Sequence, residues 1–417
     1  MKLKSEYSKN IVTLLSGNAV AQAIPIAISP ILTRLYTPED FGVVALFGSI
    51  SMLFGSIVNA QYESAIVLPR KSDDAYSIAS LSLLISIVIS IILLIIILIF
   101  HELIVDLLGT KEISVWLYFI PPVVFLIGLF NVLNYLNIRE KNFKDLSKVK
   151  VLRAISTGVV QIVIAIFKSG AFGLVVGQII SNFIGNFYLL KQTNIRKYKL
   201  FAIKNLAMAK RYKKFPIYYL PNNLIFNLSN TLINIMMSSF FGAVSLGFYS
   251  MANRILGIPG AIIGVAVSQV YLQKGAEEIK SKGTILPIFK ETFRKIFLIS
   301  LPIYLFFFFT LEEVFSFIFG NEWAIAGYYA EILTPLFFIR FIRAGLNTTI
   351  VILEKQKLEL WINAFMITCM LGIFFSAYML HMDIVYFLML FTSVMFIINL
   401  VIIFIYFNIA KKVVKFV

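Results

Sequence analysis

The feature that most constrains this sequence is a series of long, nearly unbroken apolar blocks. Between Ile85 and Phe100, for example, only Ser86 and Ser90 interrupt a run of aliphatic residues. Such blocks are typical of segments that lie in lipid. Charged residues make up only 14% of the chain, whereas soluble domains contain about 25%. The sequence therefore predicts an all-α integral membrane protein.

Hydropathy predicts twelve membrane spans of about 20 residues each. The first six lie at about 11–33, 41–67, 78–100, 115–138, 151–167 and 171–190, and the second six at about 216–241, 246–271, 296–311, 328–350, 358–380 and 384–409. These spans use well over half of the chain and leave no room for a folded domain outside the membrane.

The distribution of Lys and Arg predicts the orientation. If the amino terminus is inside, 31 of the 37 basic residues lie in cytoplasmic segments, and only Arg34, Lys111 and Lys168 lie outside. This positive-inside pattern places both termini in the cytoplasm. The first residues also resemble a cleavable signal peptide. Gly17-Asn18 interrupts the apolar stretch, however, so we expect this segment to be retained.

The chain is predicted to form two six-helix lobes. The most basic segment separates the sixth and seventh spans, which gives an N-terminal lobe at 1–190, a cytoplasmic linker at 191–215 and a C-terminal lobe at 216–417. A shift of 205 positions places Thr33–Gly42 on Ser238–Gly247 and supports a duplication. Because six spans per half is an even number, the halves have the same orientation, as in transporters built from parallel repeats.

Polar residues inside the predicted spans indicate which faces line a cavity, because such residues are costly in lipid. Amides recur on one face of both the first and the seventh span, and five asparagines occupy the seventh. Amides donate and accept hydrogen bonds and suit a ligand rich in hydroxyl groups. The alternative is that they hold neighbouring helices together. The candidate ligand-binding amides are Asn18, Gln22, Asn223, Asn227, Asn234 and Asn347.

Three arginines in the second half are candidate anion ligands: Arg254, Arg340 and Arg343. Arg340, Arg343 and Asn347 share one helix face at i, i+3 and i+7. Two guanidinium groups on one face are tolerable around an anion, and Arg binds phosphate through two parallel donors. The alternative is that these side chains extend to the lipid headgroups.

Other residues, Arg34 among them, are candidates for coupling and gating. Glu63 is the acid best placed to couple transport to H+ or Na+, and its alternative is a fixed ion pair with Arg70. Pro25 and Pro259 interrupt spans and permit bending, as gates require, although a static kink is the alternative reading.

Enzymatic chemistry is disfavoured. The chain has one cysteine, Cys369, and two histidines, and it lacks an ATP-binding loop and the common hydrolase motifs. We therefore expect no cofactor and no metal. The net charge of +16 does not indicate nucleic-acid binding, because the basic residues lie between spans.

Three segments are distinctive: SPILTRLYTPEDFG (Ser29–Gly42), YESAIVLP (Tyr62–Pro69) and AVSQVYLQKGAEE (Ala266–Glu278). They resemble the Wzx-type polysaccharide flippases of the multidrug/oligosaccharidyl-lipid/polysaccharide (MOP) superfamily. The resemblance implies a twelve-helix, two-lobed bundle that flips undecaprenyl-diphosphate-linked oligosaccharides across the bacterial inner membrane for O-antigen, lipopolysaccharide or capsule synthesis. Arg34 matches the first motif, and Glu63 and Arg254 match charged positions. Gln61 departs from the family, which often has Arg there.

We therefore expect a flippase that works by alternating access. The arginines would hold the diphosphate, the amides would hold the sugars, and the polysaccharide polymerase and chain-length machinery would be protein partners. A multidrug exporter of the same superfamily is disfavoured because the first span lacks an acid for cation coupling. A membrane oligosaccharide polymerase or ligase is disfavoured because no large outer segment is predicted.

Overall fold

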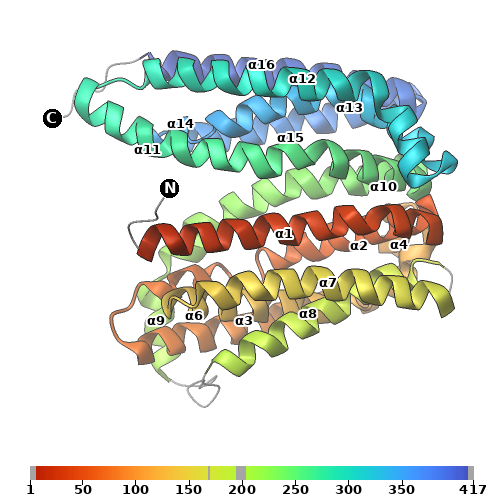
Figure 1. The fold of residues 1–417 in the computed structure, drawn as a ribbon. Helices are drawn as coiled ribbons and strands as arrows, with labels where there is room; N and C mark the ends of the chain where they lie inside the picture. The colour runs from red at the N-terminus through yellow and green to blue at the C-terminus, as the bar shows by residue number, and fades with distance from the viewer. Residues whose placement is uncertain (1–5, 168–169, 194–202, 412–417) are drawn as a thin grey trace. The chain divides into compact units, whose positions relative to one another are not determined.

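The computed structural model describes residues 6–167, 170–193 and 203–411, and within them it contains helices and no β-strand. The chain divides into two compact units, Met1–Gly247 and Phe248–Val417. Figure 1 shows the helices of each unit.

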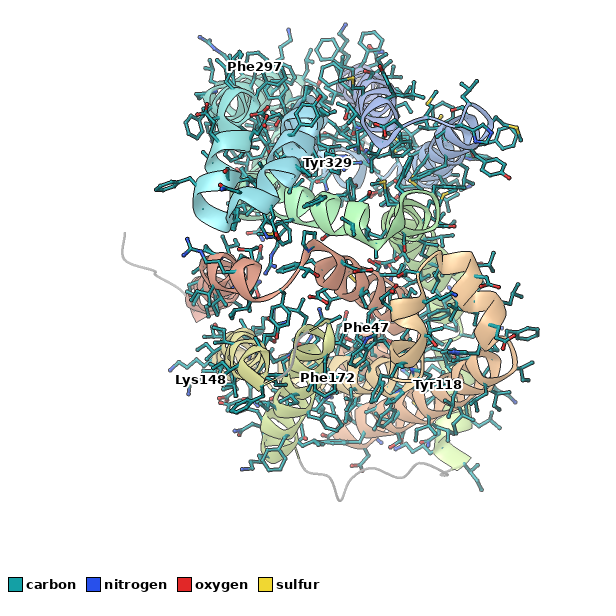
Figure 2. All side chains as sticks on the ribbon, turned by 90° about the vertical axis from the view of Figure 1, so that its right-hand side faces the viewer. Phe47, Tyr118, Lys148, Phe172, Phe297 and Tyr329 are labelled. Carbon is teal, nitrogen blue, oxygen red and sulfur yellow. The ribbon has the colours of Figure 1, made fainter. Side chains whose placement is uncertain are left out.

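The first unit contains the following helices: α1 (Glu6–Leu35), α2 (Pro38–Gly55), η1 (Tyr62–Val67), α3 (Ser72–Ile99), α4 (His101–Leu108), η2 (Lys111–Ile113), α5 (Ser114–Leu117), α6 (Ile120–Arg139), α7 (Phe143–Phe167), α8 (Phe172–Gln192), α9 (Ile203–Arg211), η4 (Phe215–Tyr219) and the first part of α10 (Leu220–Pro259). Here α7 packs against both α1 and α8, and α6 packs against α3 and α8. Phe47 points into this unit, whereas Lys148 and Tyr118 lie on its outer surface (Figure 2).

The second unit contains the end of α10, η5 (Gly260–Gly264), α11 (Val265–Lys282), α12 (Leu286–Phe319), η6 (Asn321–Trp323), α13 (Ala324–Leu346), α14 (Thr349–Ile352), α15 (Gln356–Met379) and α16 (Ile384–Ala410). In this unit α13 packs along both α12 and α16. Its core is aromatic, and Phe315, Phe341, Phe374 and Phe387 are almost completely buried.

Three of the predicted spans differ from the observed helices in where the helix breaks. The span at 41–67 is one helix only to Gly55, because Ala60 and Gln61 adopt positive φ angles of 49° and 63° and turn the chain before η1. The spans at 216–241 and 246–271 are joined by α10, which is kinked at Gly242 where φ is 82° and ψ is 170°. Only glycine adopts that backbone conformation readily.

The breaks between helices recur along the chain. The shift of 205 positions aligns Thr37, which lies between α1 and α2, with Gly242, where α10 is kinked. Lys141 before α7 and Glu354 before α15 both have positive φ, at 60° and 53°. In both turns the next backbone N–H donates to the carbonyl five residues earlier. The two turns are 213 positions apart, close to the shift of 205 positions that relates Thr37 to Gly242.

The helices present large apolar surfaces. Nine helical segments among the described residues are long and apolar enough to cross a membrane. On α3, seven aliphatic side chains from Val88 to Ile99 are at least 43% exposed. Exposed apolar surface of this extent belongs in lipid. The chain is thus a multi-pass membrane protein with an all-α fold. The count of twelve spans stays a prediction, because one of the nine segments, Phe215–Ile279, is 65 residues long.

Candidate substrate site

The motif between Ser29 and Gly42 forms a rigid turn. Thr37 caps α2 because its hydroxyl accepts the backbone N–H of Asp40, while the Asp40 carboxylate accepts the N–H of Thr37 at 2.9 Å. The buried Tyr36 hydroxyl donates to the carbonyl of Gln161 on α7 at 2.7 Å. Arg34 is exposed. The motif therefore fixes the ends of two helices and presents its arginine at the surface.

Two glycines that the repeat places at equivalent positions lie at one close helix contact. A Cβ atom on Gly42 would overlap the carbonyl oxygen of Ala243, and a Cβ atom on Gly247 would overlap the carbonyl oxygen of Pro38. The backbones of α2 and α10 therefore approach each other more closely than any other residue would allow.

Helix α7 carries two cations, Lys150 and Arg153, at the start of the predicted span 151–167. Lys150 donates to the side-chain oxygen of Asn18 on α1 at 2.7 Å. Arg153 donates to the side-chain oxygen of Asn182 on α8 at 2.6 Å, and its guanidinium lies 4.5 Å from the centre of the Phe130 ring. Both cations are partly buried. One of the predicted ligand-binding amides, Asn18, is thus the partner of a lysine.

The backbone of α8 makes room for Arg153. A Cβ atom on Gly185 would lie 2.6 Å from the Arg153 Cδ atom. Neither Arg153 nor Lys150 forms an ion pair with an acid among the described residues. The basic pair could have been anticipated from the sequence, because a helical register extended back to Phe143 places Lys150 and Arg153 one turn apart.

The second unit contains a related arrangement. Arg343 on α13 donates to the side-chain oxygen of Asn399 on α16 at 2.9 Å and to the Met366 sulfur on α15 at 3.1 Å. After the 213-position shift, Arg343 matches Phe130 and Met366 matches Arg153. One guanidinium in each unit therefore lies between three helices. Arg153 extends from α7 to α6 and α8, whereas Arg343 extends from α13 to α15 and α16.

The other two candidate arginines have no such partners. Arg340 lies over the Phe337 ring, with 5.4 Å from its Cζ atom to the ring centre, and it is close enough to Tyr249 and Arg343 to interact with them electrostatically. Arg340 and Arg254 are partly buried and form no hydrogen bond or ion pair within the described part of the chain. The structure therefore brings Arg340 and Arg343 close together, but only Arg343 is fixed by hydrogen bonds.

The amides of the seventh predicted span have different environments. Asn234 donates to the Ser49 hydroxyl of α2 at 2.6 Å, which is a contact between helices. Asn227 donates to the carbonyl of Asn223 one turn earlier at 2.9 Å. The side chains of Asn222 and Asn230 lie outside the described residues. Gln22 and Asn347 are exposed, so their side chains are available to a ligand.

Glu63 is buried in η1, with only 5% of its surface exposed. Its Oε2 atom has no hydrogen-bond partner in the described structure. No ion pair joins it to Arg70, which is exposed and whose carbonyl accepts from Arg139. The fixed ion pair between Glu63 and Arg70, which was the alternative to a coupling role, is therefore not formed in the described structure.

The two candidate hinge prolines differ. Helix α1 continues through Pro25, and the Ser29 hydroxyl donates to the Pro25 carbonyl at 2.6 Å. Pro259 ends α10 and is followed by one π-helical turn, Gly260–Gly264. No atom lies within 4 Å of a Cβ position on Gly260 or on Gly257. Single π-helical turns are frequent at functional sites.

Comparisons with known proteins agree with these observations. The model of the family described as "Polysaccharide biosynthesis protein" matches residues 31–326. The chain is 22% identical over 243 residues to the succinoglycan biosynthesis transport protein ExoT of Rhizobium meliloti, covering 58% of this chain and 48% of ExoT. It is 24% identical over 254 residues to the teichuronic acid biosynthesis protein TuaB of Bacillus subtilis, covering 60% and 51%. The chain thus spans about half the length of these relatives.

Solved structures with the same fold are transporters. The lipid II flippase MurJ in an inward closed conformation superposes with a TM-score of 0.73 at 14% identity, covering 95% of this chain and 86% of MurJ. An inward-facing multidrug resistance MATE transporter of the MOP superfamily gives 0.66 at 15% identity, covering 96% and 93%. The predicted family and fold are confirmed: this chain is a multi-pass membrane protein that belongs to the polysaccharide biosynthesis protein family and has the fold seen in transporters of the MOP superfamily.

Proposed function

We propose that this protein flips undecaprenyl-diphosphate-linked oligosaccharides across the bacterial inner membrane by alternating access. The observation that carries this proposal is the state of the basic side chains within the helices. Lys150, Arg153 and Arg343 are bound by amide oxygens, and Arg254 and Arg340 have no acidic partner among the described residues.

An amide oxygen orients a cation but does not neutralise it. A carboxylate partner would cancel the charge, so cations held by Asn18, Asn182 and Asn399 keep a positive potential inside the helical units. Charges away from water interact strongly, because the effective dielectric constant is low. A diphosphate would gain charge-assisted hydrogen bonds from these groups. A cationic drug would be repelled by them, which disfavours the multidrug exporter.

The amides that are not used to hold cations or helices suit the saccharide. Gln22 and Asn347 are exposed, and each offers both donors and an acceptor. In this proposal they bind sugar hydroxyl groups, while the cations bind the diphosphate.

Alternating access would use the two predicted lobes, 1–190 and 216–417, joined by the linker at 191–215. Both termini would be cytoplasmic. We expect cysteines within Lys191–Lys214 to react with an impermeant thiol reagent only after the membrane is opened. A cysteine at Lys168 should react in intact spheroplasts, and the opposite pattern would overturn this orientation.

Reconstitution tests the substrate. Proteoliposomes should translocate a fluorescent undecaprenyl-diphosphate oligosaccharide, as measured by its loss of accessibility to an external lectin, and they should not export a cationic dye. Dye export without flipping would support the multidrug exporter. Elongated saccharides in the same vesicles would indicate a polymerase.

A further inference from the structure

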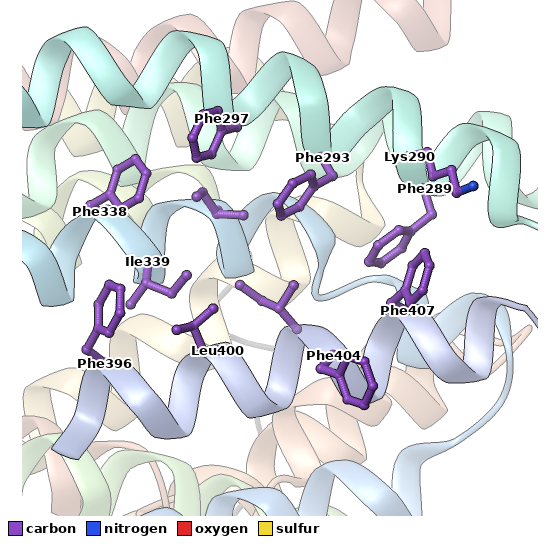
Figure 3. Close-up of a pocket in the computed structure, with 12 residues that line it drawn as sticks. Phe289, Lys290, Phe293, Phe297, Phe338, Ile339, Phe396, Leu400, Phe404 and Phe407 are labelled. Atoms are coloured by element: carbon purple, nitrogen blue, oxygen red, sulfur yellow. The ribbon is translucent and has the colours of Figure 1, made fainter. Parts of the chain in front are cut away.

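An open groove runs along the second unit between α12, α13 and α16. Its cavity volume is about 560 Å³, and seven of the twelve residues that line it are phenylalanines. Phe289 and Phe293 of α12 lie across it from Phe404 and Phe407 of α16 (Figure 3). Lys290 is the one charged residue of the lining.

Ring contacts between helices mark the two ends of this phenylalanine groove. At one end, the rings of Phe289 and Phe407 have centres 6.0 Å apart, and at the other end those of Phe297 and Phe338 are 5.8 Å apart. Between these contacts the space is not filled by side chains. An apolar space that faces lipid is not a favourable place for water. The occupant must therefore be hydrocarbon.

The groove has a charged mouth at one end only. Lys290 lies beside Phe289, and the ammonium of Lys411 lies 4.4 Å from the centre of the Phe407 ring. Both lysines belong to segments predicted to be cytoplasmic. The groove thus combines a cationic mouth with an apolar body, which is complementary to a lipid with an anionic headgroup.

The length of the groove suits the part of a lipid chain that lies near its headgroup. The lining residues of α16 extend from Phe396 to Phe407, and this length is about 16 Å at 1.5 Å per residue. That is about half of the ~30 Å hydrocarbon core.

We propose that the phenylalanine groove binds the head-proximal part of the polyprenyl chain of the lipid-linked substrate before the diphosphate reaches the buried arginines, with Lys290 and Lys411 at the diphosphate in this first position. The inference rests on the proposed function for the identity of the lipid. It adds a binding site for the chain on the second unit, in a place where neither Arg340 nor Arg343 is part of the lining.

A matched pair of positions on α16 tests this inference. Leu400 lines the groove and is 45% exposed, whereas its neighbour Val401 is 52% exposed and is not part of the lining. A benzophenone amino acid would be placed at each position in the full chain in nanodiscs. The discs would contain undecaprenyl diphosphate and phosphatidylglycerol. Cross-linked lipids would be identified by mass spectrometry.

We expect the probe at Leu400 to capture undecaprenyl diphosphate in preference to phosphatidylglycerol, and the probe at Val401 to capture both in proportion to their amounts. Lys290→Glu should reduce capture of the diphosphate at Leu400 by roughly two- to fivefold, the range for an exposed charge contact. It should leave capture of uncharged undecaprenol unchanged. Equal selectivity at the two positions, or cross-linking to a second copy of the chain, would overturn the inference.

The same nanodisc preparations, transferred to vesicles, separate this inference from the proposed function. Flipping of the fluorescent oligosaccharide without enrichment at Leu400 would reject the groove alone. Enrichment at Leu400 without flipping would keep the lipid site and reject the proposed transport.

Discussion

Replacement of Arg153 by Met separates a substrate ligand from a structural residue. The variant keeps a long, unbranched side chain but loses the guanidinium that bonds Asn182 and lies over Phe130. Loss of the donor costs about 1–3 kcal/mol, and loss of the contact with the ring costs about 0.5–2 kcal/mol. The wild type buries a charge without an acidic partner, which costs of the order of several kcal/mol in desolvation. The variant does not have this cost. We therefore expect the stability of the fold to change little or to rise.

Transport should respond in the opposite way. A charge-assisted hydrogen bond to phosphate contributes about 1.5–3 kcal/mol, so its loss should weaken binding roughly 10- to 150-fold. Arg153→Lys should restore part of the activity, because it keeps the charge but not the paired donors. The measurements are thermal unfolding in detergent and flipping in proteoliposomes at limiting substrate.

The matched control is Lys148→Met on the same helix. It also removes one positive charge, but Lys148 is 69% exposed and lies 4.0 Å from Asp145. Surface replacements of this kind change stability by about 0.5 kcal/mol or less, and we expect wild-type flipping. The reasoning is refuted if Arg153→Met flips at the wild-type rate. It is also refuted if the variant loses transport only in proportion to a large loss of stability.

Three further results are expected. In a flippase-deficient strain, the wild type should restore the surface polysaccharide and Arg340→Ala should not. Arg340→Lys should restore it partly. Full activity of the lysine variant would instead indicate a side chain that reaches the headgroups. Glu63→Gln should make flipping insensitive to pH, since this carboxyl is buried without an ion pair, and an unchanged pH profile would remove its coupling role. Gly247→Ala should lower the stability of the fold by about 1–3 kcal/mol or more, because the added Cβ atom would overlap the Pro38 carbonyl. The control Gly257→Ala should not lower the unfolding temperature, because its Cβ atom would lie in open space.

Much of the fold follows from local properties of the sequence. The apolar blocks predict helices in lipid because a helix satisfies its own backbone groups. The start of α2 follows from Pro38 and the Thr37–Asp40 capping box, which act within one turn. The internal similarity is visible in the sequence for the same reason. Gly42 and Gly247, like the polar faces of the first and seventh spans, occupy matching positions along the chain.

The site depended on contacts between distant segments. Lys150 and Arg153 lie at the edge of an apolar stretch, where a basic side chain can extend to the headgroups or turn into the protein. Their partners, Asn18 and Asn182, lie 132 and 29 residues away in sequence. No local pattern distinguishes the two outcomes.

The same limit applies to Glu63 and to the phenylalanine groove. Helical periodicity gives the direction in which a side chain points, but its environment depends on which helix packs there. The isolation of Glu63 from Arg70 and the alignment of phenylalanines from α12 and α16 are therefore properties of the packed units. The sequence alone determined that the chain forms apolar helices in lipid and where the turn between α1 and α2 lies, because these properties are local. Only the tertiary structure decided which charged side chains have partners, because that depends on neighbours far away in the chain.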